Sequence, residues 1–330
     1  MKLPELKIGP FTARIPLVQG GMSVRVSTST LAVPVAECGG IGTIGGSGIP
    51  VPELQEDIRK AKSATDGVIA VNIMYAMKNF NELVHASIEA GVDMIITGAG
   101  FSRDIFKIGR KYNIPIVSIV SSPSFARLAE KLGAAAVVVE GTEAGGHLGT
   151  DKPLREIFPV IRKVVSKVPL IAAGGVTDGF DMAEMMDEYG ADGVQIASRF
   201  VLSEECSVSQ EFKETYLKAR KEDIINVQSP VGMTGRAVKT NFIEQMERGE
   251  DVSPEKCHFK CLKKCSYKYC INDRLTASCR GDVKNGLVFC GANTYKMKEI
   301  LPVKEIFRQF VRDAESVFKE TKENWKPQKK

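Results

Sequence analysis

The most constraining feature of this sequence is a regular recurrence of short apolar runs. The runs are rich in β-branched residues, and their first residues fall between 15 and 193, about 25 residues apart. Runs of this composition and length are typical of buried strands. We predict eight strands, at Ile15–Gln19, Ile41–Ile44, Val68–Ile73, Asp93–Thr97, Pro115–Val120, Ala136–Glu140, Pro169–Ala173 and Gly193–Ala197.

Stretches with helical spacing of apolar residues separate these runs. They lie at Val51–Ala64, Asn79–Ala90, Phe101–Tyr112, Ser124–Leu132, Leu154–Ser166 and Phe180–Tyr189. Strands that are apolar throughout and alternate with helices predict a parallel sheet covered by those helices. Eight such units in about 200 residues favour the α/β fold class and a closed (β/α)₈ TIM barrel. A doubly wound open sheet is the alternative.

The rhythm stops after Phe200. We expect a barrel over residues 1–205, a smaller lid and cysteine-rich region over 206–296, and a C-terminal helix that returns to the barrel over 297–330. Within these parts, residues 208–222 are predicted to be helical, 227–240 to be a glycine-containing loop and Val303–Glu320 to be helical. The Lys326–Lys330 tail is expected to be loosely held.

Composition and charge exclude several classes of protein. Of 330 residues, 43 % are hydrophobic and 26 % charged, as in folded soluble enzymes. No apolar stretch is long enough for a membrane span, and Met1–Phe11 lack a signal-peptide pattern, so we expect a cytoplasmic protein. Residues 251–330 carry 18 Lys or Arg against 10 Asp or Glu. This excess suits either a solvated helical face or an acidic partner, and without interleaved aromatics it does not indicate nucleic-acid binding.

Most of the predicted strands end in glycine or polar residues. In a βα barrel the loops after the strands converge on one open mouth, where ligands bind. The pairs Gly174-Gly175 and Ala197-Ser198 follow the last two strands, which is the usual phosphate site of such barrels. Glycines leave backbone N–H groups open to an anion. We therefore predict a phosphate cradle there, although tight turns alone would also account for these residues.

One of the three histidines stands at a strand end. His147 follows Gly145-Gly146, whereas His85 lies in a predicted helix and His258 lies among cysteines. An imidazole titrates near neutral pH and can therefore give or take a proton. We predict His147 as the catalytic residue; a histidine that only caps a turn is the alternative.

Several of these segments together resemble one protein family. They are Gln19–Met22, Gly67–Met74, Glu140–His147, Ala172–Gly175 and Gly190–Phe200. In this order they are similar to the nitronate monooxygenase (2-nitropropane dioxygenase) family of FMN barrel enzymes, which also holds the FabK-type flavin enoyl reductases. The resemblance implies an FMN-dependent oxidoreductase acting on a small nitro or nitronate substrate. An NAD(P)H-dependent enoyl (acyl carrier protein) reductase is the alternative, and a flavin-binding sensor without turnover is a third.

The resemblance also implies roles for single residues. The residues that would contact the flavin ring or ribityl chain are Gly21, Met22, Asn72 and Glu140, with Gln195 beside the same cofactor. Those that would hold its phosphate are Gly174, Gly175, Ala197 and Ser198. His147 would act on the substrate, and Met233–Arg236 resembles a family loop that folds over the flavin. Expected partners are a small-molecule substrate and an acidic carrier or electron-transfer protein, and a homodimer is compatible with the sequence.

A cysteine cluster departs from typical members of that family. Cys257, Cys261, Cys265 and Cys270 are spaced by three, three and four residues, and lysines lie between them. In a reducing cytosol such cysteines indicate thiols or metal ligands and not disulfides. The spacing does not match a zinc ribbon, so we predict an iron–sulfur cluster ahead of zinc. A buried helix stripe is the alternative, because the first three cysteines are four residues apart.

Overall fold

The computed structural model, which describes residues 3–324, contains the predicted barrel. Eight parallel strands close on themselves in the order β10-β11-β3-β4-β5-β6-β7-β8. Every strand predicted from the sequence is present, so the TIM-barrel prediction is confirmed. The strands are β3 (Leu17–Gln19), β4 (Ile41–Gly45), β5 (Val68–Met74), β6 (Met94–Gly98), β7 (Ile116–Val120), β8 (Ala136–Glu140), β10 (Leu170–Ala173) and β11 (Gly193–Ile196).

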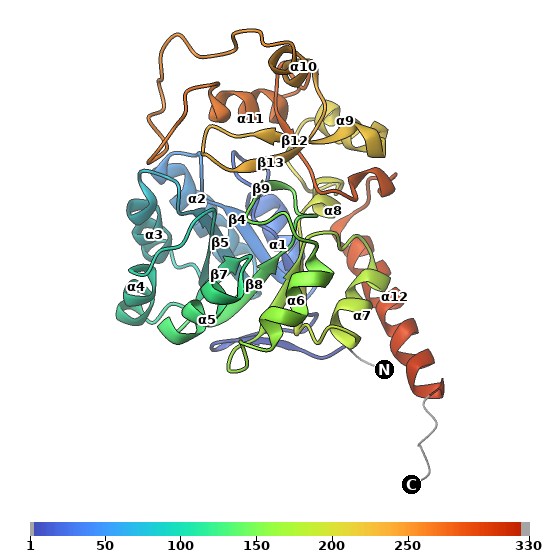
Figure 1. Ribbon diagram of the computed structural model, residues 1–330. Coiled ribbons are helices and arrows are strands. Elements are labelled where there is room, and N and C mark those ends of the chain that lie inside the picture. Colours follow the sequence, from blue (N-terminus) through green and yellow to red (C-terminus); the bar gives the residue numbers. More distant parts are fainter. Residues whose placement is uncertain (1–2, 325–330) are drawn as a thin grey trace.

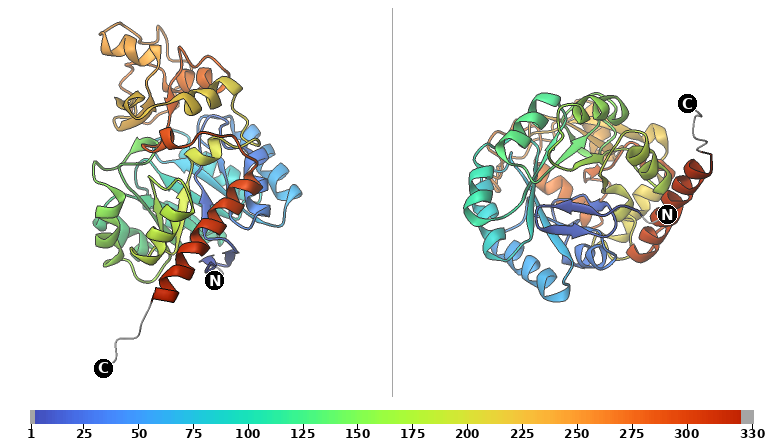
Figure 2. Two further views of the ribbon diagram at one scale, coloured as in Figure 1. Left: turned by 90° about the vertical axis from the view of Figure 1, so that its right-hand side faces the viewer. Right: turned by 90° about the horizontal axis from the view of Figure 1, so that it is seen from below.

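Helices surround the barrel, as the view along its axis shows (Figure 2). Six of them were predicted: α2 (Val51–Ala64), α3 (Phe80–Glu89), α4 (Ile105–Tyr112), α5 (Pro123–Leu132), α6 (Leu154–Arg162) and α7 (Gly179–Asp187). The sequence did not predict α1 (Ser29–Glu37) or the short α8 (Ser198–Val201). Helix α1 contains Pro34, a residue that disfavours helix interiors, but its residues Leu31, Ala32 and Val35 are fully buried. Burial therefore outweighs local preference in α1.

A hairpin closes the end of the barrel where the strands begin. It consists of β1 (Leu6–Ile8) and β2 (Phe11–Ala13), paired antiparallel. Leu6 and Ile8 are 1 % exposed and share a hydrophobic cluster with barrel-interior residues such as Met94 and Ile171. With this end closed, the opposite end is left as the binding face.

The long C-terminal helix, α12 (Val303–Asn324), packs along α7 and α1 (Figure 2). Helix α12 thus lies against two of the helices that surround the barrel. A side chain at Gly179, the first residue of α7, would collide with the carbonyl oxygen of Phe310. Glycine is therefore what lets the two helices approach so closely. The predicted loose tail, Lys326–Lys330, lies outside the described residues.

A second region covers the strand ends (Figure 1). We call residues 206–296 the cap. It contains α9 (Gln210–Lys218), η1 (Lys221–Asp223), β12 (Ile224–Gln228), β13 (Thr234–Val238), α10 (Asn241–Glu247), α11 (Ile271–Cys279), β14 (Val288–Phe289) and η2 (Thr294–Lys296). The loop predicted over 227–240 is wrong, since half of that segment belongs to the paired strands β12 and β13. Strand β9 (Gly146–Leu148), from the barrel part of the chain, joins the same sheet by pairing with β13.

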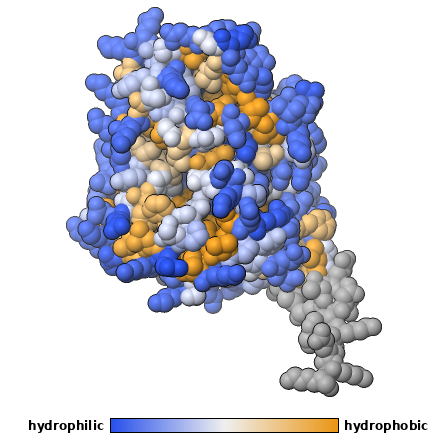
Figure 3. Space-filling view, viewed as in Figure 1, coloured by the Kyte–Doolittle hydropathy of each residue, from blue (hydrophilic) through white to orange (hydrophobic). Residues whose placement is uncertain are grey.

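The face of the molecule in Figure 3 carries both polar and apolar residues. Hydrophilic residues cover the edges of the face in Figure 3, and apolar residues gather along its middle over both the cap and the barrel. Within residues 3–324, no helix combines the length and the apolar character that crossing a bilayer requires.

Candidate active site

A cavity of about 250 Å³ lies between the barrel strand ends and the cap. All of the predicted cofactor-binding residues line it: Gly21, Met22, Asn72, Glu140, Gly174, Gly175, Gln195, Ala197 and Ser198. His147 lines it as well. Segments that are far apart in the sequence therefore meet at one site, as the barrel topology predicted.

The loop after β3 is held by a buried glutamine. The Gln19 side-chain amide donates to the Thr43 carbonyl and to Ser27 Oγ, both at 2.9 Å, and its oxygen accepts from the Thr43 N–H. Ser27 Oγ in turn accepts the N–H of Met22 at 3.0 Å. A Cβ at Gly21 would lie 2.3 Å from the Cβ of Asn72. Gly21 is thus required for the loop to pass close to the end of β5.

The four residues predicted to hold a phosphate lie together at the ends of β10 and β11. Gly174 and Gly175 both have positive φ angles, +100° and +80°, and a Cβ at Gly174 would lie 2.9 Å from the backbone nitrogen of Ala144. Ser198 Oγ accepts the N–H of Gly291 at 3.0 Å, and the Asn293 side chain donates to the Gly175 carbonyl at 2.7 Å. Sequence reasoning missed Gly291 and Asn293. The one available signal was their Gly-Ala-Asn run directly after the cysteine-rich stretch.

Two buried polar groups at this site have unusual environments. Gln195, on β11, is 8 % exposed, and its side-chain oxygen is buried without a hydrogen-bond partner among residues 3–324. Burial raises the pKa of Glu140, at the end of β8, to about 8. Glu140 is therefore mostly a neutral acid at neutral pH, able to donate as well as accept a hydrogen bond. A buried polar group normally finds a partner, so the Gln195 oxygen is positioned to meet a ligand, and the half-buried Glu140 lines the same cavity.

His147 lies in a strand and not in the loop that the sequence suggested. It is the middle residue of β9, opposite Gly235 of β13. Its Nε2 is 2.8 Å from Ser229 Oγ, and its ring meets the edge of Phe289 with centroids 5.2 Å apart. Burial lowers the pKa of His147 to about 4, so the imidazole is neutral at pH 7. Sequence reasoning did not identify Ser229 or Phe289.

The Met233–Arg236 segment contributes to the same region. Gly235 and Arg236 belong to β13, and the Arg236 guanidinium donates to the carbonyl of Ala144 at 3.1 Å and to that of Thr142. Burial lowers the pKa of Arg236 from its ordinary value. Arg236 thereby ties the cap sheet to the loop that leads from β8 to His147.

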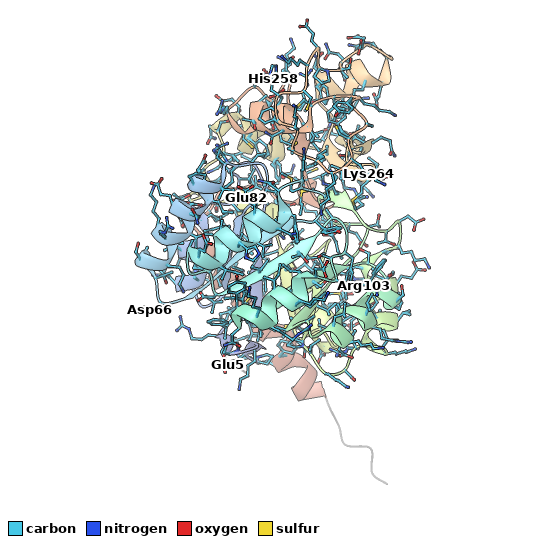
Figure 4. All side chains as sticks on the ribbon, turned by 90° about the vertical axis from the view of Figure 1, so that its left-hand side faces the viewer. Glu5, Asp66, Glu82, Arg103, His258 and Lys264 are labelled. Carbon is cyan, nitrogen blue, oxygen red and sulfur yellow. The ribbon has the colours of Figure 1, made fainter. Side chains whose placement is uncertain are left out.

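The cysteine cluster does not form a metal centre in the described structure. Cys257, Cys261, Cys265 and Cys270 line one small cavity of about 30 Å³, and every cysteine of the chain is a free thiol. No three His, Cys, Asp or Glu residues within 3–324 are arranged to hold a metal ion, so the predicted iron–sulfur or zinc site finds no support. The alternative helix stripe is wrong too, because residues 251–270 form no helix. Figure 4 shows this segment, marked by His258 and Lys264, far from the barrel floor near Glu5.

Comparisons with known proteins agree with this geometry. A family model described as nitronate monooxygenase matches residues 5–313. Over 84 % of its length the chain is 27 % identical to a dehydrogenase of Mycobacterium tuberculosis, and the match covers 80 % of that protein. The name of that dehydrogenase gives a 5-hydroxy-7a-methyl-1-oxo-octahydro-1H-indene-4-carboxyl-CoA as its substrate. It is 24 % identical to a probable nitronate monooxygenase of Staphylococcus saprophyticus, over 86 % and 89 % of the two chains. The structure of FabK from Thermotoga maritima superposes with a TM-score of 0.85 at 29 % identity, over 94 % of this chain and 96 % of that one.

Proposed function

The chain belongs to the nitronate monooxygenase family, and from this premise we propose that it is an FMN-dependent oxidoreductase that oxidises a small nitro or nitronate substrate. The observation that carries the proposal is the meeting of three features at one cavity: a pair of glycines with positive φ angles, a buried glutamine oxygen without a partner and a neutral histidine. A cytoplasmic location and a homodimer stay predictions.

The cradle fits the phosphate end of FMN. Gly174 and Gly175 leave space that any Cβ would fill, and Ala197 and Ser198 stand beside them at the end of β11. In our proposal these four residues hold the phosphate, with Gly291 and Asn293 closing the cradle from the cap side. Backbone N–H groups that follow strand ends are suited to a phosphate because each can donate without desolvating a charged side chain.

The rest of the cavity fits a flavin ring and ribityl chain. Gly21 and Met22 would border the ring from the β3 loop, with Asn72 beside them at the end of β5. The unpartnered oxygen of Gln195 and the neutral carboxyl of Glu140 would exchange hydrogen bonds with the heterocycle, which carries both donors and acceptors. FMN, when bound there, supplies the redox chemistry by accepting electrons from the substrate.

His147 is the residue that we assign to the substrate. Its imidazole lines the cavity and is neutral at physiological pH, so it can hold the reacting group by a hydrogen bond without adding charge. Phe289 packs against the ring, and Ser229 holds its Nε2. The enclosing cap would keep water away from the reacting atoms.

A second candidate function has its own support. The likeness to FabK and to a dehydrogenase named for a CoA thioester favours an NAD(P)H-dependent reductase of enoyl thioesters. In that case the basic C-terminal quarter would dock an acidic carrier protein. His147 would then face the thioester side of the substrate.

Purified protein tests the proposal directly. We expect the protein to carry FMN and an alkyl nitronate to reduce that flavin when oxygen is absent. Replacing His147 by Ala should lower kcat roughly 10²- to 10⁴-fold and leave FMN bound. His258→Ala is the matched control, since this histidine is exposed on the cap; it should leave kcat unchanged.

Each rival has a distinct outcome. Rapid bleaching by NADH or NADPH together with turnover of an enoyl thioester would favour the reductase. FMN binding without turnover of either substrate would favour the sensor. Protein that cannot bind FMN would reject all three functions.

A further inference from the structure

The aromatic neighbour of His147 comes from the opposite side of strand β13. This strand lies between β9 and β14: His147 of β9 pairs with Gly235, and Phe289 of β14 pairs with Ala237. Directly opposed residues lie on the same face of a sheet, and so do residues two apart on one strand. His147 and Phe289 therefore share one face with Gly235, and both of them line the cavity.

A glycine lets the Phe289 ring reach across β13. A Cβ at Gly235 would lie 2.8 Å from Cε1 and 3.2 Å from Cζ of Phe289, so the ring occupies the space that a side chain at 235 would need. A Cβ at Gly146, on β9, would lie 3.8 Å from the same ring, which is ordinary contact. The ring meets the His147 imidazole edge-on, at 73° and with centroids 5.2 Å apart. Gly235 is therefore what allows Phe289 to touch His147.

Hydrogen bonds hold the backbone at Phe289. Its carbonyl accepts the hydroxyl of Tyr216 from α9, and Tyr216 is 2 % exposed. The next residue, Cys290, donates its N–H to the Arg236 carbonyl of β13 at 3.1 Å. With the backbone held and the ring packed over the glycines, a displaced ring would move toward the cavity that it lines.

We propose that Phe289 is a specificity-determining residue, whose ring, packed over Gly235, closes the space beside His147 and limits the site to substrates with a short alkyl group. This inference rests on the proposed function in placing the reacting group of the substrate at His147. It deepens that function by naming the size class of the nitronate. One nitrogen joins the nitronate oxygens to the alkyl carbon, so a nitronate held at His147 brings its first carbons within reach of the adjacent ring.

Two substitutions should shift the accepted chain length in opposite directions. Phe289→Ala removes the ring, so affinity should rise roughly fourfold for each further methylene that the opened space buries. Gly235→Ala should favour shorter chains, because its methyl group displaces the ring toward the cavity. Gly235 lies in an extended strand, so alanine fits its backbone.

Ligand binding measures this effect apart from turnover. Straight-chain carboxylates, from acetate to hexanoate, share the charge and the two oxygens of an alkyl nitronate. Titrating them into the FMN-loaded protein while following the flavin absorbance gives a dissociation constant for each chain length. In the unsubstituted protein the affinity should level off before hexanoate. It should go on rising through hexanoate in Phe289→Ala, and should level off at a shorter chain in Gly235→Ala.

A double variant separates the effect of the ring from general damage. Once Phe289→Ala has removed the ring, adding Gly235→Ala should leave the chain-length profile unchanged, so the two substitutions should be strongly non-additive. Phe289→Leu keeps part of the apolar bulk and should give a smaller shift in the direction of Phe289→Ala. Phe259→Ala is the matched control, because this cap aromatic is 45 % exposed and lines the small cavity among the cysteines instead. It should leave the profile unchanged.

Three results would overturn the proposal. They are an unchanged profile in both Phe289 variants with FMN still bound, additive effects in the double variant, and an equal shift in Phe259→Ala. A profile that shifts as expected, in a protein that oxidises no nitronate, would support the role of Phe289 and reject the proposed function instead. Oxidation of alkyl nitronates with an unchanged profile would keep the proposed function and reject this inference.

Discussion

The two regions that enclose the cavity are built in different ways. The barrel surrounds it with the ends of strands that are buried throughout, such as β6 and β10. The cap covers it with short strands and helices around a small cluster of seven buried residues, Val227, Ala237, Phe242, Ile243, Tyr269, Ile271 and Leu287. Both contribute to the site: the barrel provides the glycine cradle, and the cap provides the partners of His147.

This difference separates cofactor binding from substrate chemistry. The cradle depends on backbone shape at Gly174 and Gly175, which the closed barrel fixes. The state of His147 depends on side-chain hydrogen bonds with Ser229, which the cap delivers. Damage to the first should abolish FMN binding, whereas damage to the second should alter turnover with FMN in place.

The largest effect is expected from a change at the cradle. Gly174→Ala should weaken FMN binding at least roughly 100-fold, or about 3 kcal/mol, because the new methyl group would lie 2.9 Å from the Ala144 nitrogen and fill the space proposed for the phosphate. Flavin fluorescence titration measures the loss. Gly91→Ala is the control: its φ of +88° imposes similar backbone strain, but its Cβ would meet nothing within 4 Å. Equal losses in the two variants would show that strain alone is responsible.

Sequence reasoning could predict the barrel half of this comparison. Each barrel strand is continuous and apolar, as in Ala136–Glu140, so composition alone identified it. A parallel barrel also places all carboxyl strand ends at one mouth, so residues as distant as Asn72 and Ser198 could be assigned to one cavity without knowing a single contact. Predicted strand bounds were wrong by only one or two residues, such as Ile15 in place of Leu17 at the start of β3.

The cap half could not be predicted in the same way. Segment 227–240 contains two glycines and a proline, which favour loops, but pairing with β9 and β14 stabilises β13 there. The residues that hold His147 and the cradle, among them Ser229 and Asn293, are more than 80 residues distant from their partners. No local pattern encodes such contacts, and they depend on the cap folding over the barrel.

A smaller effect should appear in the pH dependence of stability, with opposite signs for two residues at the cavity, Glu140 at the end of β8 and His147, which pairs with the cap sheet. The pKa of Glu140 is about 8 in the folded protein, against an ordinary value of 4.5 that applies to the unfolded chain. Between these two pH values the carboxyl ionises in the unfolded chain but stays protonated in the folded protein. The free energy of unfolding therefore falls as pH rises from 4.5 to 8. The pKa of His147 is about 4 in the folded protein, against an ordinary value of 6.5 that applies to the unfolded chain. Its contribution to the free energy of unfolding therefore rises as pH rises from 4 to 6.5. Between pH 6.5 and 8 only the Glu140 effect remains, about 2 kcal/mol.

Urea unfolding of flavin-free protein tests this prediction. The free energy of unfolding should fall between pH 6.5 and 8, and Glu140→Gln should remove that fall, since glutamine does not titrate. His147→Gln should keep that fall and extend it down to about pH 4.5, because in the unsubstituted protein the opposite contribution of His147 cancels the Glu140 effect between pH 4.5 and 6.5. An unchanged slope in Glu140→Gln would show that the Glu140 carboxyl ionises normally in the folded protein.

The smallest effect is expected from Cys257, in the cysteine-rich segment of the cap. Cys257→Ser should change the free energy of unfolding by less than about 0.5 kcal/mol, since this thiol is partly exposed and makes one hydrogen bond, from the Lys260 N–H, that serine can also accept. Cys290→Ser is the contrast: this thiol is 1 % exposed beside the cradle, and burying a hydroxyl there should cost roughly 1–3 kcal/mol. A loss of several kcal/mol in Cys257→Ser, with release of zinc or iron and sulfide, would contradict the prediction. It would show that a metal, and not the seven-residue cluster alone, stabilises the cap.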